Sequence, residues 1–286
     1  MPAVQPARFT VFGGAGFIGS HLVAHLRARG HQCDMPGRDQ VLKTRGPLGH
    51  VVYCIGLTAD FRSRPFDTVE AHTGLVASLL RGAQFDSFLY LSSARIYQTA
   101  ENGSETAQFT VDPADPSQLY NLTKLTGESL CLSLARAEIR VARLSNVYGP
   151  DFESANFLTA IMRDAVQHGA IHLEAHPDGA KDYVAIGNVT GMLERIALHG
   201  RHRIYNVAAG RNVTNAAIVK ELQDASGCTV EWTPGARPVS TPVIAIERLR
   251  DEFDYAPRQL PEQLASLFAL YRERYGQATL RAGAGA

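Results

Sequence analysis

The sequence predicts an α/β fold with a doubly wound parallel sheet, and three observations carry this prediction. Short apolar, β-prone runs alternate with stretches of helical periodicity over about the first 150 residues. Several runs are apolar throughout, which is typical of strands buried on both faces of a parallel sheet. A glycine-rich turn joins the first run to the first helical stretch.

The expected elements follow from local patterns in chain order. The first helix should end at Gly30, because glycine favours helix ends. The interval between the glycine-rich turn and the run GHVVYCIG is too short for a full strand–helix unit, so we expect the sheet to lack one crossover. Strands are expected at residues 9–13, 32–36, 49–56, 87–94 and 139–149, and helices at 20–30, 67–83 and 117–137.

After Pro150 the pattern becomes less regular. From Cys228 onward we expect a chain rich in loops. This region is interpreted as a smaller lobe against the carboxyl edge of the sheet, where ligands bind in folds of this class. Before Cys228, helices are expected at 156–169 and 214–227, a strand and a helix within 181–200, and a strand within 202–210.

Composition argues against several classes of partner. The 28 Lys and Arg residues balance 28 Asp and Glu residues, so no net charge attracts nucleic acid or an acidic membrane. No apolar run is long enough to span a bilayer and the N-terminus has no apolar signal core, so we expect a cytoplasmic protein. The four cysteines and ten histidines show no metal-ligand spacing, and we expect neither a metal site nor disulfides.

The stretch GGAGFIGSHL predicts a dinucleotide site of the Rossmann type. Its glycines follow an expected strand and open an expected helix. Gly13 would allow a tight turn, Gly16 would let the backbone approach a pyrophosphate, and Gly19 would let the helix pack on the strand. The helix N-terminus would supply unpaired N–H groups for the phosphates. The alternative is a structural turn without a ligand.

The residue after the second strand indicates which dinucleotide is bound. NAD sites usually place an acidic side chain there, which accepts hydrogen bonds from the ribose diol. This sequence has Gly37 followed by Arg38, whose guanidinium could hold a 2′-phosphate. The pattern therefore favours NADP over NAD. The alternative is that Asp34 or Asp39 takes the acidic role.

Three residues form a candidate catalytic group. Tyr120 and Lys124 are four apart, so they share one face of an expected helix. A nearby ammonium lowers the pKa of a phenol, which would make a tyrosinate base available near neutral pH. Ser93 ends an expected strand and could hydrogen-bond the same substrate oxygen. A Tyr-x-x-x-Lys pattern is common by chance. It indicates a catalytic role here because it follows the glycine turn and the strand-end serine in chain order.

With these motifs the sequence resembles the extended short-chain dehydrogenases/reductases, in the nucleotide-sugar epimerase/dehydratase group. The resemblance covers about residues 8–275 and is carried by GGAGFIGSHL, LSSARIY, LYNLTKLTGE, VARLSNVYGP, DGAKDYVAIGNV and YNVAAG. It implies a Rossmann fold, NADP or NAD as cofactor, and a nucleotide-linked sugar as substrate.

The resemblance also implies roles for single residues. Tyr120 would be the acid/base, Lys124 would bind the nicotinamide ribose and tune Tyr120, and Ser93 would orient the substrate oxygen. Asn146 would contact the diphosphate of the substrate, and Lys181 stands where many relatives carry an arginine. The cofactor would contact Gly13, Gly16, Phe17, Ile18, Gly19, Arg38, Ile55, Gly56, Tyr120, Lys124 and Val147; the substrate would contact Ser93, Ala94, Arg95, Asn146 and Lys181.

Departures from the family pattern narrow the expected chemistry. The 4,6-dehydratases carry an Asp-Glu pair where this chain has Ala94 and Arg95, so water elimination is not expected. Relatives that epimerise at C3 and C5 place a cysteine at the Arg95 position, which argues against that route. The asparagine of the family's proton relay is replaced by Ala71, with His72 beside it, so a different relay is expected.

These observations lead to one preferred function and two alternatives. The preferred function is reduction of a nucleotide-linked 4-keto sugar, often 6-deoxy, by hydride transfer with Tyr120 as acid/base. The first alternative is a 4-epimerase that holds NAD tightly. The second alternative is a dinucleotide-binding regulator without catalysis.

The expected organisation includes a homodimer. Residues 1–153, completed by about 182–209, would form the Rossmann domain; 154–181 and 210–275 would form the substrate lobe, and 276–286 a flexible tail. The resemblance implies that helices 67–83 and 117–137 pair with their copies in a second chain. Candidate contacts are Leu122, Leu125, Leu130 and Leu132, and the alternative is that they pack against their own sheet.

Overall fold

The fold is built around a parallel sheet of six strands. The computed structural model describes residues 5–43, 46–58 and 60–283, without side chains at positions 39, 42 and 276–283. All neighbouring strands of the large sheet run parallel, in the order β2-β1-β3-β4-β5-β9. These strands are β1 (Arg8–Phe12), β2 (Gln32–Asp34), β3 (His50–Tyr53), β4 (Ser87–Ser93), β5 (Ile139–Leu144) and β9 (Ile204–Val207).

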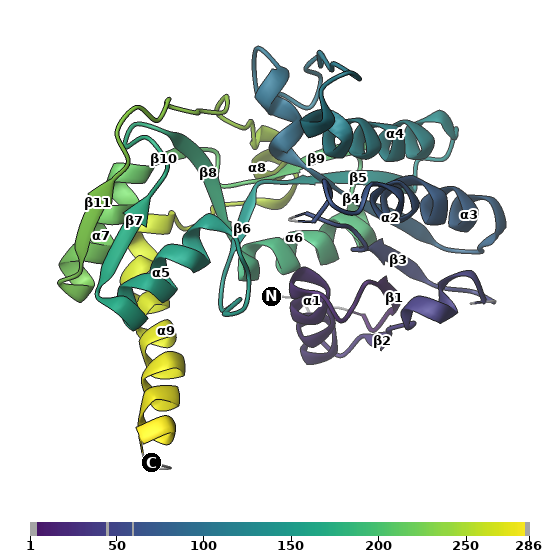
Figure 1. Cartoon of the computed structure of the whole chain (residues 1–286). Coiled ribbons are helices and arrows are strands. Elements are labelled where there is room, and N and C mark those ends of the chain that lie inside the picture. Colours follow the sequence, from purple (N-terminus) through teal and green to yellow (C-terminus); the bar gives the residue numbers. More distant parts are fainter. Residues whose placement is uncertain (1–4, 44–45, 59, 284–286) are drawn as a thin grey trace.

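Helices cover both faces of this sheet, which confirms the predicted doubly wound class (Figure 1). Apolar side chains spaced by one helical turn, such as Leu22 and Leu26, anchor one face. Val76 and Leu79 anchor the other. The first face carries α1 (Phe17–Ala28) and α6 (Ile186–His199), and the second carries α3 (Leu75–Gly82) and α4 (Leu119–Ser133).

The strand order reverses beside β1, and this positions the candidate site. From β1 the chain passes to β2 on one side and then to β3 on the other. Ligands in such sheets bind where the direction of winding changes, outside the carboxyl ends of the strands. In the described residues between β2 and β3 the chain forms the 3₁₀-helix η1 (Arg38–Lys43) and no α-helix, so this connection lacks the full strand–helix unit for which the sequence left no room.

The expected helix 67–83 contains a π-helical turn. It consists of α2 (Pro65–Val69), the π-helix η2 (Glu70–Gly74) and α3. A π-turn changes the pairing of nearby backbone groups, and two buried phenols bind carbonyl oxygens there: Tyr53 donates to Ala71 O at 2.6 Å and Tyr90 donates to His72 O at 3.1 Å. The sheet therefore fixes the position of the turn that contains His72.

The expected strand 139–149 is two strands in different sheets. β5 ends at Leu144, and β6 (Asn146–Tyr148) pairs with β8 (Ala180–Ala185). β8 in turn pairs with β10 (Asn212–Thr214), which gives a second sheet of three strands. The chain thus leaves the large sheet after Leu144 and carries Asn146 toward the C-terminal half of the molecule.

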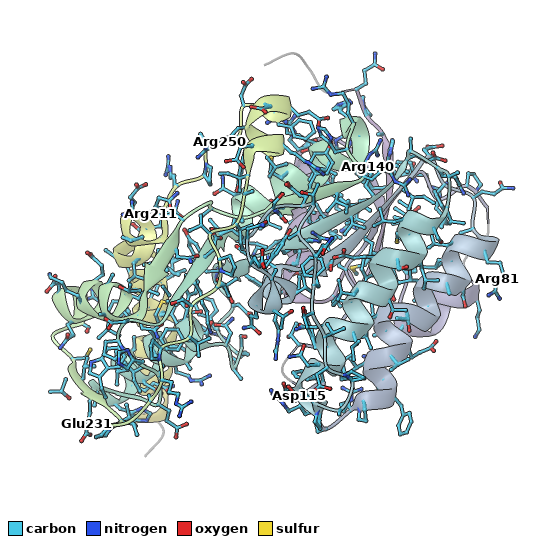
Figure 2. The ribbon with its side chains drawn as sticks, turned by 90° about the horizontal axis from the view of Figure 1, so that it is seen from above. Arg81, Asp115, Arg140, Arg211, Glu231 and Arg250 are labelled. Carbon is cyan, nitrogen blue, oxygen red and sulfur yellow. The ribbon has the colours of Figure 1, made fainter. Side chains whose placement is uncertain are left out.

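A second hydrophobic core lies in the smaller lobe. Its helices α5 (Phe157–His168), α7 (Asn215–Ser226) and α9 (Leu260–Gly283) pack with the strand pair β7 (Ala170–Leu173) and β11 (Thr229–Trp232). In Figure 2, Asp115 lies at the end of the large unit that is nearer to this lobe, and Arg81 lies at the opposite end. The N-terminal end of α4, which follows Asp115, is therefore turned toward the smaller lobe.

The chain from Cys228 onward differs from the expected loop-rich region. It contains β11, α8 (Glu247–Phe253) and α9. Leu249 and Phe253 of α8 pack into the core of the large sheet, so this segment does not belong to the core of the smaller lobe. α9 continues to Gly283 and includes most of the stretch for which we expected a flexible tail; residues 284–286 lie outside the described residues.

Two histidines serve packing between α1 and α6. Glu194 of α6 accepts hydrogen bonds from His25 at 2.6 Å and His31 at 2.9 Å. Burial raises the pKa of Glu194, but these hydrogen bonds outweigh burial and lower it to about 2.

In the described residues no group of three or more His, Cys, Asp or Glu could hold a metal ion, and no helix is long and apolar enough to cross a membrane.

Candidate active site

The glycine turn has the geometry that a bound pyrophosphate needs. Gly13 has a φ of +81°, which a residue with a side chain rarely adopts. Gly16 is the N-cap of α1, and none of the described side chains caps this helix end. The first N–H groups of α1 are therefore available to an anion. A Cβ at Gly19 would lie 2.2 Å from Gly13 O, so only glycine lets the helix approach the turn. These residues fit a dinucleotide.

Replacing Gly19 by alanine is expected to lower the free energy of unfolding by about 1–3 kcal/mol, because the new Cβ would overlap the backbone of the turn. The matched control is Gly187→Ala in α6, where a Cβ meets no atom within 4 Å and helix propensity improves. Urea unfolding of the two variants compares them. Equal stabilities would contradict the close packing of α1 on the turn.

The segment after β2 passes close to the glycine turn. A Cβ at Gly14 would lie 2.2 Å from Met35 Cγ. Asp34 is level with Thr10, before the turn, and its carboxylate accepts two hydrogen bonds from Arg8 at 3.1 and 2.8 Å. The Asp34 carboxylate is therefore paired with Arg8 at the surface. Arg38 follows at the start of η1 and is exposed, while the Asp39 side chain lies outside the described residues.

Ser93 and Tyr120 meet at the carboxyl end of β4. Ser93 is the last residue of β4, and Tyr120 lies in the first turn of α4. Burial raises the pKa of the Tyr120 phenol, and a hydrogen bond with Ser93 and the charge of Arg95 lower it in part. The two residues that the sequence singled out are thus close enough for Ser93 to influence the phenol of Tyr120.

Lys124 lies one helical turn after Tyr120 on α4, and its ammonium is buried. Its buried ammonium donates to Leu91 O at 2.9 Å. Burial lowers the pKa of Lys124 to about 8, although the Glu128 carboxylate raises it in part. The positive charge that lowers the pKa of Tyr120 in this structure comes from Arg95, whereas we expected it from Lys124.

His72 completes the cluster from the π-helix. Its ring stands edge-on to Tyr120, with 5.3 Å between centroids. Leu57 N donates to His72 Nε2 at 3.2 Å, so the proton lies on Nδ1, which donates to Thr123 Oγ1 at 2.8 Å. Burial and the Lys124 charge lower the pKa of His72 to about 3, and the ring is neutral. His72 therefore holds these elements together without titrating near neutral pH.

The loop after β3 lies against His72 and Lys124, and the end of β6 lies against the first turn of α1. A Cβ at Gly56 would lie 3.2 Å from His72 Nε2 and 3.3 Å from Lys124 Nζ, so Gly56, next to Ile55, lies against the cluster. A Cβ at Gly149 would lie 3.3 Å from the Phe17 ring. Because Gly149 directly follows β6, the turn that contains Phe17 and Ile18 lies near Val147.

The residues expected to bind substrate come from three segments. Asn146 donates one amide N–H to Asp182 O at 2.8 Å, which fixes the Asn146 side chain. The second N–H of the amide remains as a donor for a ligand. Burial and the charge of Arg95 lower the pKa of Lys181. Ala94 is buried directly after Ser93. Lys181 of β8 and Arg95 of the 3₁₀-helix η3 (Ala94–Thr99) therefore share one electrostatic environment.

Sequence reasoning missed Phe61 and Arg62. The Phe61 ring centroid lies 5.6 Å from that of Tyr120. The guanidinium carbons of Arg62 and Arg95 lie 4.5 and 5.0 Å from the Phe61 centroid. The only available signal was an aromatic residue between charged ones in the loop after β3, which is too common to select. The fold brings this loop to the Tyr120 ring.

Curated relatives share parts of this chain. A GDP-mannose 3,5-epimerase 1 from Oryza sativa subsp. indica is 28% identical over 186 residues, which are 51% of this chain and 48% of the relative, so the chain spans about half of that protein. A GDP-6-deoxy-D-mannose reductase from Pseudomonas aeruginosa is 26% identical over 251 residues, 78% of this chain and 82% of the relative.

The solved structures show the same fold. RMD from Pseudomonas aeruginosa complexed with NADPH superposes with a TM-score of 0.76 at 23% identity, covering 94% of this chain and 99% of that chain. The family model of the NAD dependent epimerase/dehydratase family matches residues 9–208, which include the glycine turn, Ser93, Tyr120 and Lys124. The family expectation drawn from the motifs is thus confirmed, and this chain belongs to the NAD dependent epimerase/dehydratase family.

Proposed function

We propose that this chain is an NADP-dependent oxidoreductase that reduces a 4-keto sugar linked to a nucleotide. The observation that carries the proposal is the placement of Ser93 and Tyr120 next to one another at the carboxyl end of β4, with the buried ammonium of Lys124 on the same helix. A hydroxyl, a phenol and an ammonium at this point suit the binding and protonation of a carbonyl oxygen.

Tyr120 is the proton donor in this proposal. Burial raises the pKa of Tyr120, so the phenol is protonated at neutral pH and can give its proton to the carbonyl oxygen. Ser93 holds the same oxygen, and the Arg95 charge stabilises the phenolate that remains. A bound nicotinamide dinucleotide would supply the hydride that the carbonyl carbon receives. Hydride and proton together convert the carbonyl to a hydroxyl.

The cofactor preference rests on the segment after β2. The glycine turn would hold the pyrophosphate, Arg38 the 2′-phosphate, and Lys124 the nicotinamide ribose. The pairing of Asp34 with Arg8 supports this choice, because it already engages one acidic candidate for the ribose diol.

Asn146 and Lys181 would bind the diphosphate of the substrate. Ala94 and Arg95 supply no acid–base pair for water elimination.

The test of the proposed reduction is consumption of NADPH with a panel of UDP-, GDP- and dTDP-linked 4-keto sugars. Oxidation of NADPH by one of them supports the reductase. Interconversion of two 4-epimers with retained NAD, and no net NADPH consumption, would replace it by the epimerase.

We further propose a homodimer through α2, α3 and α4. Leu125 and Leu132, named from the sequence, pack against the chain's own cores, so they are poor candidates for the interface. Phe66 and Val69 of α2 are 87% and 43% exposed, and they offer apolar surface to a second copy.

Phe66→Asp is expected to convert the dimer to a monomer, because a charge would enter the apolar interface. Light scattering after size-exclusion chromatography measures the mass of the wild-type chain and the variant. Val243→Asp is the control, since Val243 is also 59% exposed but lies outside these helices. A monomeric wild type, or a dimer that tolerates Phe66→Asp, would disprove this interface.

A further inference from the structure

Arg95 is placed at the reacting end of the candidate site. It lies two residues after Ser93, and its guanidinium carbon is 5.4 Å from the centroid of the Tyr120 ring. The same carbon lies 5.0 Å from the centroid of the Phe61 ring. Two aromatic rings therefore seat this cation next to the phenol that we assign to proton transfer.

The charge of Arg95 has no counter-charge in the described part of the chain. No described carboxylate forms an ion pair with it, and its Nε is buried without a hydrogen-bond partner there. Its charged neighbours are cations: Arg62 acts on Arg95, and Arg95 acts on Lys181. A guanidinium that is half-buried among like charges is costly unless something binds it.

Arg62 differs from Arg95 in this respect. Hydrogen bonds from Ser117 and the charge of Arg62 lower the pKa of the Asp115 carboxylate, so Arg62 has an acidic neighbour. Arg62 and Asp115 line a pocket of about 360 Å³ near the N-terminal ends of α2 and α4. The charge of Arg62 is thus partly compensated by Asp115, whereas the charge of Arg95 is available to a ligand.

The ligand that fits Arg95 is a planar anion. A guanidinium presents a fork of N–H groups that matches the two oxygens of a carboxylate. The diphosphate of a nucleotide sugar is assigned to Asn146 and Lys181, on β6 and β8. Arg95 lies instead beside Tyr120, where the sugar must place its reacting carbon. An anion bound at Arg95 therefore belongs to the sugar.

We propose that Arg95, seated on Phe61, binds a carboxylate of the sugar, so that the substrate is an acidic nucleotide sugar. This inference rests on the proposed function, because it assumes a nucleotide sugar in the site. It also refines that function: a 6-deoxy sugar, the class expected from the sequence, brings no anion and leaves Arg95 without a partner.

The test compares matched acidic and neutral ligands by calorimetry on the full chain loaded with NADPH. The pairs are UDP-glucuronic acid with UDP-glucose, GDP-mannuronic acid with GDP-mannose, and dTDP-glucuronic acid with dTDP-glucose. In the pair whose nucleotide binds, the acid is expected to bind at least about tenfold more tightly, as a charge-assisted bidentate contact predicts. Arg95→Met should reduce this ratio to about one, and Arg95→Lys should retain part of it.

Arg81→Met is the control, since Arg81 lies at the end of α3 away from the smaller lobe (Figure 2) and should leave the ratio unchanged. Equal affinities within a pair, or a ratio that survives Arg95→Met, would overturn the inference while leaving the proposed function intact. If NADPH binds but no ligand of any pair does, the nucleotide-sugar part of the proposed function fails, and this inference fails with it.

Discussion

Tyr120→Phe is expected to lower turnover of the keto sugar by about 100- to 10,000-fold, the range for loss of a general acid. The variant keeps the ring that packs against His72 and Phe61, so the fold and NADPH affinity should persist. Steady-state kinetics with the substrate found in the panel measures the effect, which should fall on kcat. The loss follows from the missing proton, since Ser93 and Lys124 remain in place.

Tyr271→Phe is a suitable control for that experiment. Its hydroxyl is also buried, and it donates to Asp151 O at 3.1 Å in the smaller lobe. This variant should retain turnover within about tenfold, because Tyr271 is not part of the acid–base group. Full biological activity of the Tyr120→Phe variant would contradict the hypothesis that Tyr120 catalyses a reaction, and it would favour a dinucleotide-binding regulator.

Glu128→Ala is expected to lower the free energy of unfolding by about 3–5 kcal/mol, because it leaves a buried guanidinium without its counter-charge. Arg143 donates to Glu128 at 3.0 and 2.7 Å, and both side chains are only 4% exposed. The same guanidinium donates to the Tyr97 hydroxyl at 2.8 Å. The pair therefore ties α4, which carries Tyr120, to β5 of the large sheet.

The matched control is Glu138→Ala. Glu138 pairs with Arg136 at a similar distance of 2.8 Å, but these side chains are 36% and 39% exposed. Exposed pairs contribute about 0–1 kcal/mol, so this variant should unfold almost like the wild type. Urea denaturation at neutral pH compares both variants. Equal losses for Glu128→Ala and Glu138→Ala would refute the assignment of a buried ion pair.

Local patterns were sufficient for the large sheet and its helices, because each buried element leaves an apolar period in the sequence. They were insufficient where a strand-like stretch can pair with strands of either of two sheets. The strand-like stretch 139–149 gives no sign that pairing changes at Ser145, where β5 has ended and β6, which pairs with β8, begins. The π-turn around His72 is equally hidden, since one wider turn barely alters a helical period.

The candidate site was predicted as far as spacing determines it. The i, i+4 rule placed Tyr120 and Lys124 on one helix face, and the fold does bring Ser93 to Tyr120. The electrostatics could not be predicted, because they depend on where the ammonium and guanidinium point. Lys124 turns to Leu91 O, and Arg95 turns to the phenol ring.

The central claim is that the glycine turn and Arg38 bind NADPH for reduction. The most direct measurement is to denature freshly purified protein, identify any released dinucleotide by mass spectrometry, and titrate the emptied protein with NADPH and NADH. We expect no stoichiometric NAD, tighter binding of NADPH, and loss of that preference in Arg38→Ala. Stoichiometric NAD would contradict the reductase and indicate the epimerase, and a chain that binds neither dinucleotide would contradict the whole account.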